Sequence, residues 1–152
     1  MSERPNQKYY KIYSHEYTIV QKCAFCRGLS TDFELSRKCG PMYGPVKIGK
    51  NLPEVYFHEL CATWCPEIYY NESNKVQNLK EGIKRSKTIK CSFCTEWGGG
   101  LGCKYEQCPN SYHYLCAVTV TGPDDSKALF MNDFHLYCPD HRKMASAEDM
   151  AN

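Results

Sequence analysis

Twelve cysteine and histidine side chains in this sequence occur as six short-range pairs, a spacing typical of metal ligands. The pairs are Cys23 with Cys26, His58 with Cys61, Cys91 with Cys94, Cys103 with Cys108, His113 with Cys116, and Cys138 with His141. Tetrahedral zinc takes four sulfur or nitrogen ligands at about 2.0 to 2.3 Å, and two residues about three apart can reach one ion from a tight turn. Two pairs complete one site, so the six pairs predict three zinc ions.

Disulfide bonding and catalysis are the alternatives to metal binding. Residues 1–13 contain no apolar run that could serve as a secretory signal, and no segment reaches the roughly 18 apolar residues needed to cross a bilayer. We therefore expect an intracellular protein without a membrane partner, in a reducing compartment that disfavours structural disulfides. Zinc held by four protein ligands has no open position, so we expect structural sites, no small-molecule substrate and no enzymatic activity.

The apolar composition indicates that such cross-links are needed. Leu, Ile and Val number 21 and Phe 6, about 18% of the 152 residues, which is below the level of an ordinary packed domain. Disorder would go with high net charge and few aromatic residues, whereas the net charge is +2 and aromatic residues make up 13%. Zinc binding contributes about 10 to 16 kcal/mol per structural site, enough to replace a missing apolar core.

The order of the last eight ligands resembles that of a known zinc module. From Cys91 to His141 the order is Cys, Cys, Cys, Cys, His, Cys, Cys, His, with a long gap before the last pair. It resembles the PHD finger, in which alternate pairs share an ion. The resemblance implies one ion on Cys91, Cys94, His113 and Cys116 and another on Cys103, Cys108, Cys138 and His141. The first half would close a third site as a zinc knuckle of Cys23, Cys26, His58 and Cys61.

Longer motifs make the resemblance specific. The stretches HELCATWCPEIYY, NKVQNLKEGIKRSKTIKC, GGGLGC, YHYLC and CPDH resemble the extended PHD family, in which a zinc knuckle precedes an atypical PHD finger. Cys65, Gly99 with Gly100, residues 85–87 and residues 122–125 depart from the family pattern, but none of them removes a ligand. The resemblance implies a small zinc-stabilised α+β fold, a nuclear location and chromatin partners, namely a histone tail, duplex DNA or a nucleosome, and other chromatin proteins.

The elements that must position the ligands are short. We expect an N-terminal segment over 1–19, a zinc knuckle over 20–74, a basic connecting helix within 75–90, the PHD finger over 91–142 and a flexible tail over 143–152. A helix is predicted over 58–65, ended by Pro66, and another over 78–86, capped by Asn78. Strands are predicted near 101–104, 116–120 and 135–138.

Charge is distributed unevenly along the chain. Residues 1–50 hold nine basic and four acidic side chains, residues 75–90 hold six and one, residues 51–74 hold none and four, and residues 91–152 hold four and eight. A basic helix could neutralise DNA phosphates, whereas an acidic PHD half suits a basic histone tail. The predicted nucleic-acid contacts are Lys80, Lys84, Arg85, Lys87 and Lys90. The alternative is that these side chains only solvate a helix face.

A peptide site is predicted at Trp97, Leu101, Gly102 and Lys104, where a tail could add as a strand because the glycines allow close backbone approach. Trp64 lies inside a family motif, and core packing is expected of it. PHD fingers that read methyl-lysine typically carry Trp two residues before the seventh ligand. Leu136 stands there, which argues against an aromatic cage.

Two further interpretations stay open. Cys39 and Cys65 are expected to be bystander thiols, with substitution for a zinc ligand as the alternative. The second function considered is a protein-interaction or ubiquitin-ligase-type adaptor, because RING domains share the cross-braced ligand arrangement. A RING needs an exposed apolar groove, and the polar loop TEWGGGLG followed by Cys103 and Lys104 is a poor match.

Overall fold

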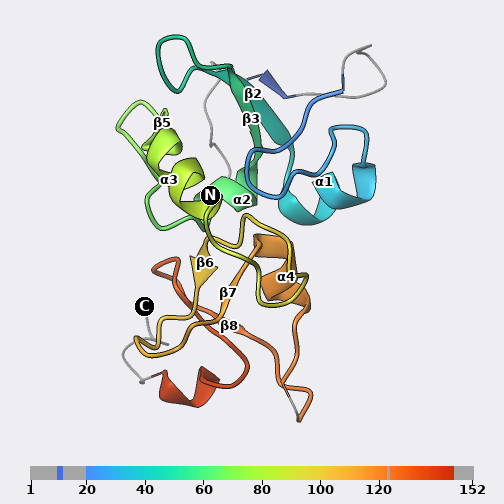
Figure 1. Ribbon diagram of the computed structural model, residues 1–152, viewed down its shortest axis with the longest axis vertical. Helices are drawn as coiled ribbons and strands as arrows, with labels where there is room; N and C mark the ends of the chain where they lie inside the picture. The colour runs from blue at the N-terminus through green and yellow to red at the C-terminus, as the bar shows by residue number, and fades with distance from the viewer. Residues whose placement is uncertain (1–9, 12–19, 123, 146–152) are drawn as a thin grey trace.

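The described residues of the computed structural model, 10–11, 20–122 and 124–145, form two halves stacked along the long axis (Figure 1). The first half contains β1 (Tyr10–Lys11), α1 (Phe33–Cys39), β2 (Met42–Val46), β3 (Val55–His58), α2 (Glu59–Thr63), β4 (Tyr69–Tyr70), β5 (Val76–Gln77) and α3 (Leu79–Ser86). The second contains β6 (Leu101–Gly102), β7 (Ser111–Tyr112), α4 (Tyr114–Thr119), β8 (Leu129–Phe130), β9 (Leu136–Tyr137) and the 3-10 helix η2 (Arg142–Met144).

The sheets are small and antiparallel. Strands β1, β2 and β3 form a three-stranded sheet, with Tyr43 opposite Phe57 and Met42 opposite His58 in the β2–β3 pair. The pairs β4–β5, β6–β7 and β8–β9 are two-stranded ribbons. A lone ribbon of this size is marginal in water, so its stability must come from what it packs against. The zinc-stabilised α+β class predicted from the sequence is confirmed.

Two apolar cores replace the single core of an ordinary domain. The first is built around Phe57 and Met42, with Leu79 and Ile83 of α3 against it. The second surrounds Leu136, which is fully buried, with Leu101 and Tyr112 from the β6–β7 ribbon. Cysteines of the six ligand pairs lie inside both cores, so zinc binding and apolar burial stabilise the same regions.

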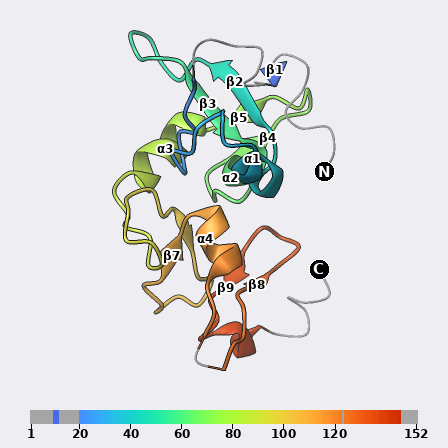
Figure 2. The same ribbon diagram turned by 90° about the vertical axis from the view of Figure 1, so that its right-hand side faces the viewer.

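Trp64, the residue that ends α2, joins the two halves. Its ring lies edge-on to those of Phe130 and Phe134, with 4.9 Å and 5.2 Å between ring centroids. It also stacks on Tyr114, with 6.5 Å between centroids. Helix α4 also lies against α1 and α2 (Figure 2). Trp64 therefore packs in the interior, as the sequence predicts, and fixes how the two halves sit on each other.

Several predicted elements need correction. The strand predicted near 116–120 is wrong, because α4 covers most of these residues although Val118 and Val120 are β-branched. The helix brings Cys116 one turn from His113, a constraint that outweighs local strand propensity. The predicted helix over 58–65 is shorter, Glu59–Thr63, because His58 ends β3. Asn78 precedes α3 in the left-handed conformation and makes no side-chain cap.

Other expectations hold or lie outside the described residues. The strands predicted near 101–104 and 135–138 are present as β6 and β9. The N-terminal segment except 10–11, and the tail from 146 onward, are not described. Over the described ranges, none of the helices has both the length and the apolar character to cross a membrane.

Candidate metal centres and binding surfaces

Three compact groups of three cysteines and one histidine form in the fold. Within each group the four ligand atoms all lie within 4.8 Å of one another, close enough to hold one metal ion. The groups are Cys23, Cys26, His58 and Cys61 (site 1), Cys91, Cys94, His113 and Cys116 (site 2), and Cys103, Cys108, Cys138 and His141 (site 3). The structure therefore brings together the same twelve residues in the groupings that the sequence and the resemblance assigned.

The distances between donor atoms fit a tetrahedral zinc ion. Ligands at about 2.3 Å for sulfur and 2.0 to 2.1 Å for nitrogen imply a separation of about 3.8 Å between two sulfurs and about 3.5 Å between sulfur and nitrogen. The Sγ atoms of Cys108 and Cys138 are 3.7 Å apart. Across the three sites, sulfur lies 3.2 to 3.9 Å from histidine Nδ1. The donor sets fit three zinc ions.

Tight turns position the Cys-x2-Cys pairs. In each turn a backbone N–H two residues beyond a cysteine donates to its sulfur: Phe25 N–H to Cys23 and Phe93 N–H to Cys91, both at 3.4 Å, and Gly28 N–H to Cys26 at 3.3 Å. Asn110 N–H does the same for Cys108 at 3.4 Å. Amide donors stabilise the thiolate form, which is the form that binds metal.

Helix starts position the His-x2-Cys pairs. His58 precedes α2 and His113 precedes α4, and the cysteine three residues later lies in the first turns of each helix. Both histidines face their site through Nδ1. The Nε2–H of His113 donates to the carbonyl oxygen of Trp97 at 2.9 Å, which fixes the ring orientation and the tautomer that leaves Nδ1 free to bind metal.

The protonation of the clustered thiols also favours a cation. At site 1 the pKa of Cys23 lies well below its usual value, and the hydrogen bonds of Cys26 and Cys61 with its sulfur, followed by its charge, raise the pKa of those two thiols. At site 2, burial raises the pKa of Cys91, but backbone N–H donors, including those of Cys94 and Phe93, outweigh it and lower the value to about 7. A divalent cation neutralises such clusters.

A sequence profile for a PHD-like zinc-binding domain matches residues 58–142, more than half of the chain. The chain belongs to this family. The matched segment holds sites 2 and 3 completely but only His58 and Cys61 of site 1, whose other two ligands lie upstream.

The chain is similar to segments of much longer proteins. It is 30% identical over 132 residues to histone-lysine N-methyltransferase trithorax of Drosophila melanogaster, covering 84% of this chain and 3% of that protein. It is 27% identical over 123 residues to histone-lysine N-methyltransferase 2D of Homo sapiens, covering 81% of this chain and 2% of that protein. With BRCA1-associated RING domain protein 1 of Arabidopsis thaliana it shares 38% identity over 88 residues, 57% of this chain and 12% of that protein.

Cys39 and Cys65 lie outside the three ligand groups of the PHD-like domain. Cys39, at the end of α1, is fully buried, and its thiol contacts Cys61 of site 1. Cys65 lies beyond α2, is buried, and donates to the Glu67 carboxylate at 3.4 Å. Burial raises the pKa of Cys65 to about 11, so its thiol stays protonated at neutral pH. Their placement agrees with a packing role.

Five lysines form an exposed group that we call the lysine surface. Lys80 and Lys84 of α3 and Lys87, the residue that ends it, follow one another at helical spacing, and all three are exposed. A methyl group built on Gly49 would lie 3.8 Å from Nζ of Lys80, so the β2–β3 loop, which also carries the exposed Lys47 and Lys50, lies beside the start of the helix. Sequence reasoning missed these two, although the basic excess of residues 1–50 pointed towards them. Within the described residues, none of the five forms an ion pair.

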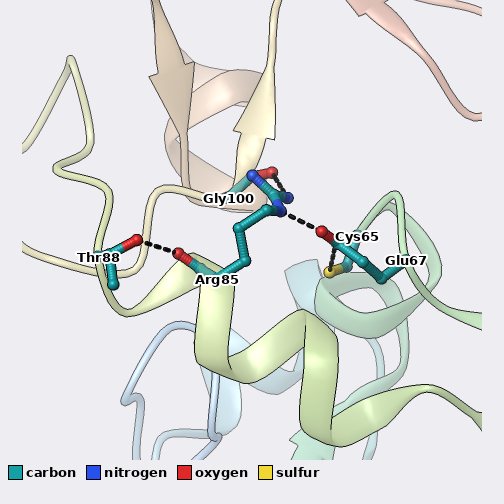
Figure 3. A network of polar contacts seen from close by, with 5 residues as sticks. All are labelled: Cys65, Glu67, Arg85, Thr88 and Gly100. Atoms are coloured by element: carbon teal, nitrogen blue, oxygen red, sulfur yellow. Dashed lines mark hydrogen bonds and ion pairs between the residues drawn. The ribbon is translucent and has the colours of Figure 1, made fainter.

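The other two predicted nucleic-acid residues have contacts of their own. Arg85 forms an ion pair with Glu67, and its guanidinium also donates to the Gly100 carbonyl at 2.6 Å (Figure 3). It therefore links the two halves and is less available for phosphate than the exposed lysines. Lys90 is exposed, and its ammonium lies 5.4 Å from the ring centroid of Trp97.

The predicted peptide edge is mostly occupied by the protein itself. The backbone N–H and C=O groups of Gly100, Gly102 and Lys104 point away from β7. Successive residues of a strand point their backbone groups to opposite sides, and the N–H of Cys103 donates to the Asn110 carbonyl on the β7 side. The Gly100 carbonyl accepts from Arg85, and Lys104 N–H donates to the Leu136 carbonyl at 2.7 Å. The parallel bridge between Cys103 and Leu136 places β9 along this same side of β6, so little backbone at Gly102 is left for an added strand.

The side chains along this edge differ in accessibility. Trp97 is 46% exposed, whereas Leu101 is 5% exposed and packs in the second core. The Lys104 ammonium lies 3.5 Å from Asp133. The glycines allow close approach of the protein's own segments, because a methyl group on Gly100 would lie 2.1 Å from Ser86 Oγ.

Proposed function

We propose that this chain is a non-catalytic, chromatin-associated module of the nucleus whose lysine surface binds duplex DNA. The observation that carries the proposal is that two separate segments, α3 with its end residue and the β2–β3 loop, meet at Gly49 and Lys80 and together carry five exposed lysines. A surface that only solvates a helix would not need a second segment of the same charge beside it.

The lysine surface has the physical properties of a phosphate-binding surface. Leu79 and Ile83 are buried on the opposite face of α3, and Arg85 ties the helix to both halves, so the lysines are held on a rigid support. Each lysine that neutralises a DNA phosphate releases about 0.9 counterion, which makes binding strongly dependent on salt. Contacts of this kind carry no base specificity.

The three ligand groups support this function structurally. We propose that the twelve cysteines and histidines bind three zinc ions as closed sites with four protein ligands each. Closed zinc has no position for a substrate or a reactive water, so the sites hold the two halves in place and leave recognition to the surface.

A histone tail is the second chromatin partner that we propose. The acidic excess of residues 51–74 and 91–152 suits a lysine- and arginine-rich peptide. Strand addition at Gly102 offers too little open backbone to carry such binding alone, so side-chain recognition elsewhere must contribute.

Salt-titrated fluorescence anisotropy with labelled duplex DNA tests the proposed function. We expect saturable binding at low salt that weakens by roughly tenfold or more when Lys80, Lys84 and Lys87 are replaced by Gln. The matched control replaces three exposed lysines elsewhere, Lys22, Lys127 and Lys143, by Gln. It therefore has the same net charge as the first triple variant. Equal losses in the two triple variants would mean that net charge, not this surface, governs binding, and the proposed site would be wrong.

An adaptor role in ubiquitin transfer is the alternative, favoured by the similarity to a relative named BRCA1-associated RING domain protein 1. An autoubiquitination assay with a panel of conjugating enzymes separates the two functions. We expect no ubiquitin chains above the enzyme-only background, and chain formation that depends on the PHD-like domain would favour the adaptor.

A further inference from the structure

A pocket of about 350 Å³ lies where the two halves meet. One wall comes from the segment that follows α2, including Pro66, Ile68, Tyr69 and Tyr70, and the other from the β8–β9 turn, including Asp133 and Phe134. Its volume lies within the range of about 300 to 1,000 Å³ typical of ligand pockets. None of the residues predicted from the sequence to bind DNA or a peptide lines it.

The chemistry of the lining favours a cation with an apolar stem. The rings of Tyr69 and Phe134 and the apolar side chains of Ile68 and Pro66 line it, together with the carboxylate of Asp133. No lysine or arginine is among the lining residues, but Lys104 Nζ lies 3.5 Å from the Asp133 carboxylate and His135 Nδ1 lies 3.3 Å from it, so an incoming cation would share this carboxylate with them. Asp133 is exposed, and its slight desolvation raises the pKa of the carboxyl, but the neighbouring His135 and Lys104 outweigh this and lower the pKa below its usual value.

The segment that supplies most of the first wall is acidic. Residues 51–74 contain four acidic and no basic side chains, although none of the four lines the pocket itself and Glu67 is paired with Arg85. A lysine or arginine side chain buries its methylene stem on apolar surface while its charged end meets aromatic faces and a carboxylate. A neutral side chain would gain the apolar contact of the stem but not the contacts of the charged end.

We propose that this pocket receives a lysine or arginine side chain of a basic peptide. The identity of that peptide as a histone tail rests on the proposed function, whereas the pocket chemistry does not. A peptide bound in this pocket does not need the β6 edge, where Arg85 and Leu136 already bond most of the backbone groups that an added strand would use.

Binding of labelled core-histone tail peptides, measured by anisotropy, tests the pocket with two matched pairs of variants. Asp133→Asn is compared with Glu106→Gln, an exposed acid outside the pocket, and Tyr69→Ala with Phe93→Ala, an exposed aromatic outside it. We expect affinity to fall roughly tenfold for Asp133→Asn and about fivefold for Tyr69→Ala, and less than twofold for the two controls. Copies of the peptides with every Lys and Arg replaced by Gln should not bind. Zinc content is measured for each variant to show that the fold is intact.

Amide chemical-shift mapping locates the peptide. Shifts concentrated at Ile68, Tyr69 and Phe134 support the pocket, whereas shifts confined to Trp97 and Gly102 would overturn it in favour of strand addition. Unchanged affinity in both pocket variants would also overturn it, as would the absence of peptide binding by a chain that binds DNA. Peptide binding at the pocket by a chain that does not bind DNA would leave this inference standing and remove the DNA proposal.

Discussion

Arg85 of α3 forms an ion pair with Glu67, which lies in the loop after α2 (Figure 3). The same guanidinium donates to the Gly100 carbonyl, in the strand region of the second half. One side chain thus ties three segments together: the loop after α2, helix α3 and the residues just before β6. Both partners of the ion pair are partly buried, so solvent screens the pair only in part.

The first prediction concerns this link. Arg85→Gln and Glu67→Gln should each lower the free energy of unfolding by about 1 to 2 kcal/mol, because each leaves a partly buried partner without its charge-assisted contact. A double-mutant cycle followed by chemical denaturation should give a cost for the double variant that is smaller than the sum of the two. Strictly additive costs would show that the pair contributes no coupling. Arg85→Gln should reduce DNA affinity less than Lys84→Gln does.

The second prediction concerns zinc. Native mass spectrometry should find three zinc ions per folded chain, and strong chelation should unfold it, because structural zinc supplies much of its stability. Cys39→Ala and Cys65→Ala should each retain three ions, whereas Cys61→Ala should lose one. Loss of an ion from the Cys39 variant would make that thiol a ligand in place of one assigned to site 1.

The third prediction concerns the joint between the halves. Trp64→Ala should cost about 3 to 5 kcal/mol, since it removes a large ring packed on Phe130, Phe134 and Tyr114. Trp97→Ala is the matched control and should cost much less, because that ring is 46% exposed. Thermal and denaturant unfolding of the zinc-loaded variants measures both. Similar costs at the two positions would contradict the interior role of Trp64.

The fourth prediction concerns the Gly100 contact with α3. Gly100→Ala places a methyl group 2.1 Å from Ser86 Oγ and 3.0 Å from its Cβ, so the helix and the loop must move apart. Overpacking of this kind costs about 1 to 3 kcal/mol. Ser86→Ala removes the closer atom and should restore part of the loss in the double variant. No recovery would indicate that the cost arises from the backbone of residue 100 and not from this contact.

The fifth prediction separates the loop lysines from the helix lysines. Lys47→Gln with Lys50→Gln should reduce the salt dependence of DNA binding by about 0.9 per lysine that contacts phosphate, with little change in stability because both are exposed. The slope of log K against log salt for this pair is compared with that for Lys127→Gln with Lys143→Gln. An unchanged slope would confine the DNA contacts to α3.

The sequence by itself determined the ligand pairs, because a short turn or a single helical turn fixes the distance between residues three apart. It also determined the need for zinc, since so few aliphatic residues cannot form a large core. Local patterns were less reliable where the metal geometry intervened. Val118 and Val120 favour a strand by propensity, yet the region is helical because Cys116 must lie one turn from His113.

Only the tertiary structure decided the surfaces. Arg85 has the same sequence signature as the lysines beside it, but folding places Glu67 and Gly100 within its reach and turns a charged helix residue into a link between halves. Gly49 and Lys80 are far apart in the sequence, and the path of the β2–β3 loop brings them together. The pocket lined by Tyr69 and Phe134 likewise combines residues of the two halves. Such long-range contacts depend on packing between segments, which no local spacing encodes.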